Sequence, residues 1–173
     1  MGPSPPAQPA TSVEVLGQAP GYLVSAHHNV LIACWTAQGT APMVEAFGHI
    51  LDAFIAQHAE GISTVHLISA GLPLATGGAR DVLTALMKKH GHAVACVGTV
   101  LEGTGFWASA TRSLILGLQL VAPNSVAMRT YASVTEIATW LPKPHAQRTG
   151  IVIEPQELEQ SVTIARAQAV TAG

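Results

Sequence analysis

The hydrophobic positions of the first forty residues follow the spacing of β-strands. Three apolar runs occur there, SVEVLGQ at 12–18, GYLVSA at 21–26 and NVLIACWT at 29–36. The second and third runs flank the polar residues His27-His28-Asn29. Two apolar runs joined by so short a polar segment predict an antiparallel hairpin with the two histidines in its turn.

Beyond residue 40 the pattern alternates between the helical period and the strand period. The predicted order is a helix at 43–60, a strand at 64–69, a helix from Thr76 to Gly91, a strand at 92–101, a helix at 104–120, a strand at 126–131 and a helix beginning at Ser133. Strands that alternate with helices favour parallel pairing and an α/β fold. We therefore expect a mixed sheet of about five to six strands flanked by about four helices.

Both ends of the chain differ from this pattern. The first residues, MGPSPPAQPATS, are rich in proline and predict a disordered leader. Near the other end, Ser133 and Glu136 have the spacing of a capping box, while Pro142 and Pro144 predict a break in the helix. An additional helix is expected at 154–170. The predicted division is a leader at 1–11, one domain at 12–142, and a linker with a C-terminal helix at 143–173.

Charged residues are scarce, and this narrows the classes of partner. Asp, Glu, Lys and Arg make up 10% of the chain, hydrophobic residues make up 49%, and the net charge is −2. The chain thus lacks the basic surface that nucleic acid or anionic lipid requires. A surface so poor in charge predicts contact with a protein partner or with a second copy of the chain. The apolar stretch 105–122 contains Arg112 and Gln119 and is short for a membrane span, so we expect no membrane span.

No pattern indicates an enzyme. Cys34 and Cys96 lie inside apolar strand-like runs, as inert buried thiols do, and such cysteines favour a cytoplasmic location. The pairs His27-His28 and His90/His92 lack the ligand spacing of common zinc sites. We therefore expect no catalytic residues, no cofactor and no metal.

The segment LISAGLPLATGGARDVL at 67–83 passes from a strand through a loop into a helix. It resembles the signature of the STAS domain family, the anti-sigma-factor-antagonist fold. Ile68-Ser69 matches the end of the family's strand, Thr76 its phosphorylatable serine, and Gly78 its glycine. Leu67 and Ala75 stand where the family often has aspartates. The resemblance covers about residues 12–142 and implies a STAS-like sheet and a regulatory function without catalysis.

The residues themselves give this junction two interpretations that can both hold. Thr76 is placed to cap the following helix, and a phosphate on its hydroxyl would meet the amides of Gly77 and Gly78 and the side chain of Arg80. Phe106 and Trp107 follow the next strand and should lie at the same end of the sheet. We expect these six residues to form the surface that binds a protein partner or a second copy.

Two alternatives remain open. The chain is also interpreted as a sensor of a small apolar ligand or lipid, which would occupy a pocket between the third helix and the sheet. The third interpretation is a structural homo-oligomer.

Overall fold

The computed structural model describes residues 12–121 and 126–171, and its centre is one six-stranded sheet. The strands are β1 (Glu14–Ala19), β2 (Tyr22–His27), β3 (Val30–Trp35), β4 (Ile62–Ile68), β5 (Val94–Leu101) and β6 (Ala127–Tyr131). They lie in the sheet in the order in which they occur in the sequence. The first three pair antiparallel, and β3 to β6 pair parallel. The α/β class and the mixed sheet predicted from the sequence are confirmed.

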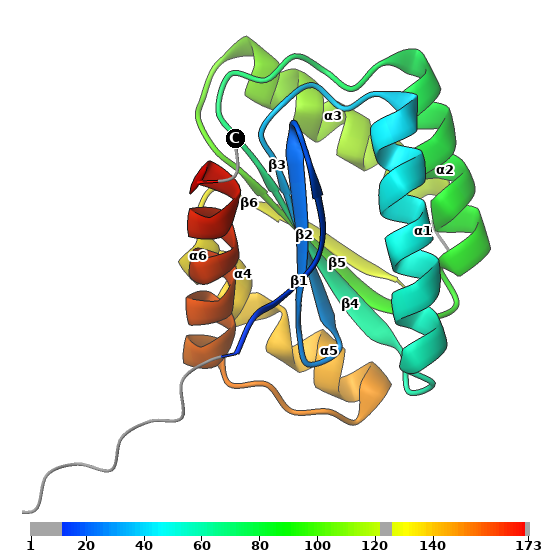
Figure 1. Cartoon of the computed structure of the whole chain (residues 1–173), viewed down its shortest axis with the longest axis vertical. Helices are drawn as coiled ribbons and strands as arrows, with labels where there is room; N and C mark the ends of the chain where they lie inside the picture. Colours follow the sequence, from blue (N-terminus) through cyan, green and yellow to red (C-terminus); the bar gives the residue numbers. More distant parts are fainter. Residues whose placement is uncertain (1–11, 122–125, 172–173) are drawn as a thin grey trace, which may run out of the picture.

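Within the described residues, six helices cover the two faces of the sheet. They are α1 (Ala41–Gln57), α2 (Gly77–His90), α3 (Phe106–Val121), α4 (Val134–Trp140), α5 (Pro142–Thr149) and α6 (Pro155–Thr171). Crossovers between parallel strands are right-handed, and β3 to β6 follow one another in a single direction. The crossover helices α1, α2 and α3 must therefore lie on one face, and α4 to α6 lie on the other (Figure 1).

Each face of the sheet has its own hydrophobic core. Alternate residues of a strand point to opposite faces. Ile32 and Cys34 of β3 pack with Leu158 and Val162 of α6, whereas Leu31, Ala33 and Trp35 belong to the core beneath α1. All six residues of β3 are buried, as expected for a central strand covered on both sides.

The chain after Pro142 differs from the sequence prediction. Residues 143–150 were expected to belong to a linker, but α5 extends over Pro142–Thr149. Its prolines occupy the first and third positions of the helix. Backbone N–H groups in this first turn have no hydrogen-bond partner within a helix, so proline does not interrupt α5 there. The predicted C-terminal helix is present as α6 and packs against β2 and β3. The predicted leader, residues 1–11, lies outside the described residues.

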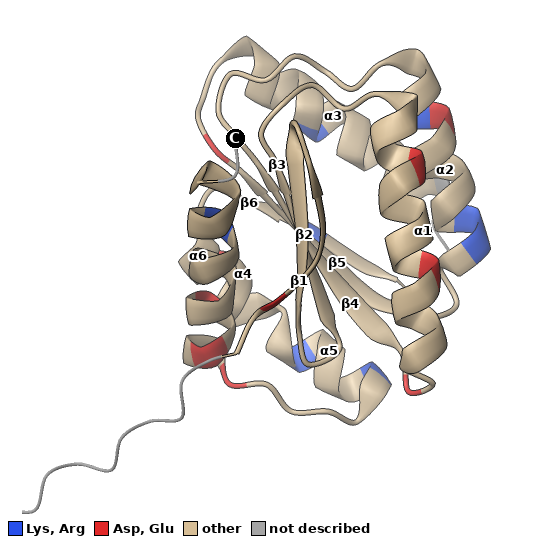
Figure 2. Cartoon of the chain, in the orientation of Figure 1, with Lys and Arg blue, Asp and Glu red and all other residues tan. Residues whose placement is uncertain are grey.

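Charged residues occur on the helices, on connecting loops and on β1 in Figure 2. The described residues contain no helix that is both long and apolar enough to cross a membrane.

Candidate functional site

The loop after β4 and the start of α2 lie at the carboxyl end of the parallel strands. Thr76 precedes α2, and its hydroxyl oxygen accepts a hydrogen bond from the Ala79 amide at 3.3 Å, so the predicted helix cap is present. The loop is held against the β3–α1 connection, because the Thr76 amide donates to the Gly39 carbonyl at 3.0 Å. The Gln38 side chain donates to the Leu74 carbonyl at 2.7 Å. The junction is thus anchored, while Thr76 itself is exposed.

Arg80 lies close to this junction. Its guanidinium nitrogen is 3.8 Å from the position that a Cβ on Gly77 would occupy. Gly77 and Gly78 are both exposed, so the backbone at the helix start is accessible from outside. A negative group on Thr76 would therefore lie near backbone amides and a cationic side chain.

Phe106 and Trp107 begin α3 and lie at the same end of the sheet as Thr76. Phe106 is 75% exposed and Trp107 is 43% exposed. The two rings contact each other edge to face, with centroids 5.2 Å apart. Further along α3, Leu116 and Leu120 are also exposed, at 59% and 88%. The outer side of this helix is therefore more apolar than most solvent-facing helix surfaces.

Beneath α3 the structure contains an apolar cavity of about 150 Å³. Its walls come from the sheet, from α1, α2 and α3, and from the loop that leads to Thr76. Aliphatic and aromatic side chains make up most of the wall, including Leu83, Met87, Leu114, Ile115 and Leu118. Sequence reasoning placed the pocket of the ligand-sensor alternative between the third helix and the sheet, and a cavity is present there.

His66 forms the polar part of the cavity wall together with Trp35 and two threonines, Thr99 and Thr111. The Trp35 indole N–H donates to His66 Nδ1 at 3.2 Å, so the imidazole carries its proton on Nε2, which lies 3.2 Å from the Thr64 hydroxyl. The Trp35 and His66 rings are stacked, with an angle of 13° between their planes. Burial lowers the pKa of His66 to about 4. This neutral histidine gave no signal in the sequence, because it lies within an ordinary strand pattern.

The cysteines are buried and unlinked, as predicted. Burial raises the pKa of Cys34 to about 12 and that of Cys96 to about 11, which keeps both as unreactive thiols. Cys96 contacts the Ser63 hydroxyl at 3.1 Å, and Ser63 in turn lies 2.8 Å from His145 Nδ1. Ser63, Cys96 and His145 are all fully buried. These three residues are of the types found in nucleophilic active sites, but their burial leaves no access for a substrate.

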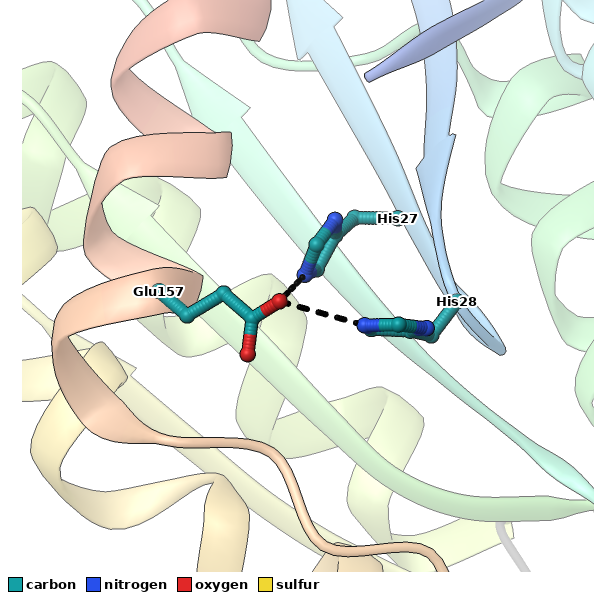
Figure 3. A group of neighbouring side chains, drawn as sticks. All are labelled: His27, His28 and Glu157. Carbon is teal, nitrogen blue, oxygen red and sulfur yellow. Dashed lines mark hydrogen bonds and ion pairs between the residues drawn. The ribbon is translucent and has the colours of Figure 1, made fainter. Parts of the chain in front are cut away.

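At the opposite end of the sheet, Glu157 of α6 approaches the histidines of the β2–β3 turn (Figure 3). Glu157 Oε1 lies 3.2 Å from Nε2 of His27 and 3.2 Å from Nε2 of His28. No local sequence pattern links Glu157 to the two histidines, because it lies 129 residues after His28.

A comparison of the chain with protein-family models and with curated proteins finds no match.

Proposed function

We propose that the protein is a non-enzymatic sensor that binds a small apolar molecule in the cavity beneath α3. The observation that carries this proposal is the cavity itself, about 150 Å³ in volume and lined mainly by apolar side chains. An apolar cavity of this size accommodates a molecule about as large as benzene. Ligand pockets of α/β sheets also favour the carboxyl ends of the strands, where this cavity lies.

A ligand that enters this cavity would remove its own hydrocarbon surface from water, and burial of apolar surface stabilises the bound state by roughly 25 cal/mol per Å².

The ligand class follows from the wall. Most of the lining is hydrocarbon, and the polar groups are the Trp35–His66 pair and the Thr99 and Thr111 side chains. His66 is neutral, so the wall has no charge to attract an anion. We propose a monocyclic aromatic compound or a short alkyl chain with at most one hydroxyl or carbonyl group.

The test measures thermal unfolding of the full chain in the presence of toluene, indole and 1-hexanol. A ligand at 100 times its dissociation constant stabilises the folded state by about 2.7 kcal/mol. Leu114→Trp places a larger side chain in the wall and should abolish the increase in Tm. Leu116→Trp makes the same change on the exposed side of α3 and should preserve it. No increase with any apolar probe, or equal increases in both variants, would refute the proposal.

A second candidate function is the binding of a protein partner through Thr76, Gly77, Gly78, Arg80, Phe106 and Trp107. The specific observation in its favour is the exposed aromatic pair at the start of α3, because Phe and Trp contribute strongly to protein interfaces. Because α3 also forms a wall of the cavity, a bound ligand could shift α3 and thereby change the position of Phe106 and Trp107. The resemblance to STAS domains supports a regulatory role of this kind.

The experiment for the second candidate compares Trp107→Ala and Thr76→Glu with the unmodified chain. A partner isolated from the host would be purified, and its affinity for each form measured by calorimetry. Trp107→Ala should weaken binding by tenfold or more, as loss of an interface aromatic residue does. Light scattering of the same samples distinguishes a partner from a homo-oligomer. Unchanged affinity and unchanged mass in both variants would contradict this surface.

A further inference from the structure

We infer that His27, His28 and Glu157 form a binding site for a divalent transition-metal ion, with Zn²⁺ as the preferred ion. These residues are distinct from the cavity beneath α3, because the β2–β3 turn and the start of α6 lie at the other end of the sheet (Figure 1). The ligand atoms are Nε2 of each histidine and a carboxylate oxygen of Glu157, and all three lie within 4.8 Å of one another.

The spacing of these atoms fits tetrahedral coordination. With metal–nitrogen and metal–oxygen bonds of about 2.0 to 2.2 Å, two ligand atoms of a tetrahedral zinc ion lie about 3.3 Å apart. The two histidine-to-carboxylate distances are both 3.2 Å. Figure 3 shows both imidazoles pointing toward the same carboxylate oxygen from the hairpin turn. A metal ion next to this oxygen would need only small movements of the three side chains.

The hydrogen bonding of His27 supplies an independent observation. Its Nδ1 lies 3.0 Å from the Ser12 carbonyl oxygen, which can only accept, so Nδ1 carries a proton. Metal-binding histidines commonly donate their second ring nitrogen to a carbonyl in this way, and the contact fixes the tautomer. The tautomer thus presents a lone pair at Nε2 of His27.

That Nε2 atom is buried and makes no hydrogen bond within the part of the chain that the structure describes. His27 is 4% exposed, so water does not compensate for the missing partner. Glu157 Oε1 lies 3.2 Å from this nitrogen, but an ionised carboxylate can only accept a hydrogen bond, so it cannot pair with the Nε2 lone pair. A metal ion bound by both residues would accept the Nε2 lone pair and also bind the carboxylate oxygen. It would therefore give Nε2 the partner that Glu157 alone does not provide.

The set of donors indicates which ions fit. Two imidazole nitrogens and one carboxylate are ligands of zinc sites that keep a position open, whereas Mg²⁺ and Ca²⁺ favour oxygen ligands. The three ligands border a cleft of about 930 Å³, which is also lined by residues of α1 and β1. The remaining coordination position of the ion would face this cleft and hold water.

The test is a zinc titration of the tag-free, metal-stripped full chain in competition with a chromogenic chelator. We expect one zinc ion per chain. Glu157→Gln and His27→Ala should each weaken the affinity by about 100-fold or more, because loss of a direct ligand exceeds the 10- to 100-fold effect of an outer-shell change. Cobalt substitution should give the intense visible absorption of a four-coordinate ion.

His49→Ala is the matched control, because His49 lines the same cleft on α1 and is not one of the three ligands. It should leave zinc affinity within about twofold of the unmodified chain. Glu157 is partly exposed, and Gln preserves its size, so Glu157→Gln tests the site even where His27→Ala lowers stability. Absence of zinc binding, or equal affinity in the unmodified chain and Glu157→Gln, would overturn the inference.

Discussion

Gly98 in the middle of β5 allows α4 to pack unusually close to the sheet, and replacing it tests this packing. A Cβ at Gly98 would lie 2.1 Å from Cδ1 and 2.7 Å from Cγ1 of Ile137. Carbon atoms attract each other best at about 3.5 to 4.0 Å, so Ile137 or the whole of α4 would have to move. Ile137 is fully buried and has little free space.

The expected effect of Gly98→Ala is the difference between two terms. Overpacking of a core costs about 1 to 3 kcal/mol, and the severe overlap with Ile137 favours the upper end. Loss of backbone freedom in the unfolded chain returns about 0.4 to 1 kcal/mol. We therefore expect a net loss of about 2 kcal/mol in the free energy of unfolding.

Urea denaturation followed by far-ultraviolet circular dichroism measures this loss as a lower midpoint with an unchanged slope. Ile137→Ala removes the atoms that Gly98→Ala overlaps, so the double variant should lose at least 1 kcal/mol less than the sum of the single variants. Gly117→Ala is the control, because a Cβ there meets no atom within 4 Å and Ala favours a helix. A change in the free energy of unfolding of less than about 0.5 kcal/mol in Gly98→Ala, on the order of a surface substitution, would show that Gly98 is not required for the close packing of α4.

Two further predictions concern pH and thiol chemistry. Burial lowers the pKa of His66 from 6.5 to about 4 in the folded chain. Because the unfolded chain binds the proton more readily, the free energy of unfolding should be unaffected by His66 above pH 6.5 and should fall by up to about 3 kcal/mol between pH 6.5 and 4. His66→Asn, which keeps an acceptor for Trp35, should reduce this dependence in urea titrations at several pH values, and an unchanged dependence would contradict it. Cys34 and Cys96 should react with a thiol reagent only as fast as the chain unfolds, and rapid labelling of the native protein would disprove their burial.

Local signals explain which parts of the fold could be predicted. The alternation of periods identified the strands and helices, and the Ser133–Glu136 capping box is present with both of its hydrogen bonds. The prolines after Leu141 were misinterpreted because proline disfavours the interior of a helix but not its first turn. In α5 the first turn begins at Pro142, directly after α4 ends.

The sites depended on contacts that no local pattern contains. Thr76 was found because its cap involves neighbours three residues apart. Glu157 joins His27 and His28 only after α6 has packed against β2, and the Trp35–His66 pair forms only when β3 and β4 lie side by side. Such sites are set by the arrangement of whole elements and not by the period of a segment.

The placement of α4 to α6 on one face of the sheet has a consequence for synthesis on the ribosome. Strands β1 to β5 are synthesised before α4 to α6, so the apolar side chains of Leu23, Ile32 and Val65 are at first not covered by these helices. The nascent chain therefore exposes this side of its sheet until α4 to α6 have left the ribosome. This half of the core forms after the half beneath α1 to α3, and chaperones that recognise apolar strands have more time to bind there.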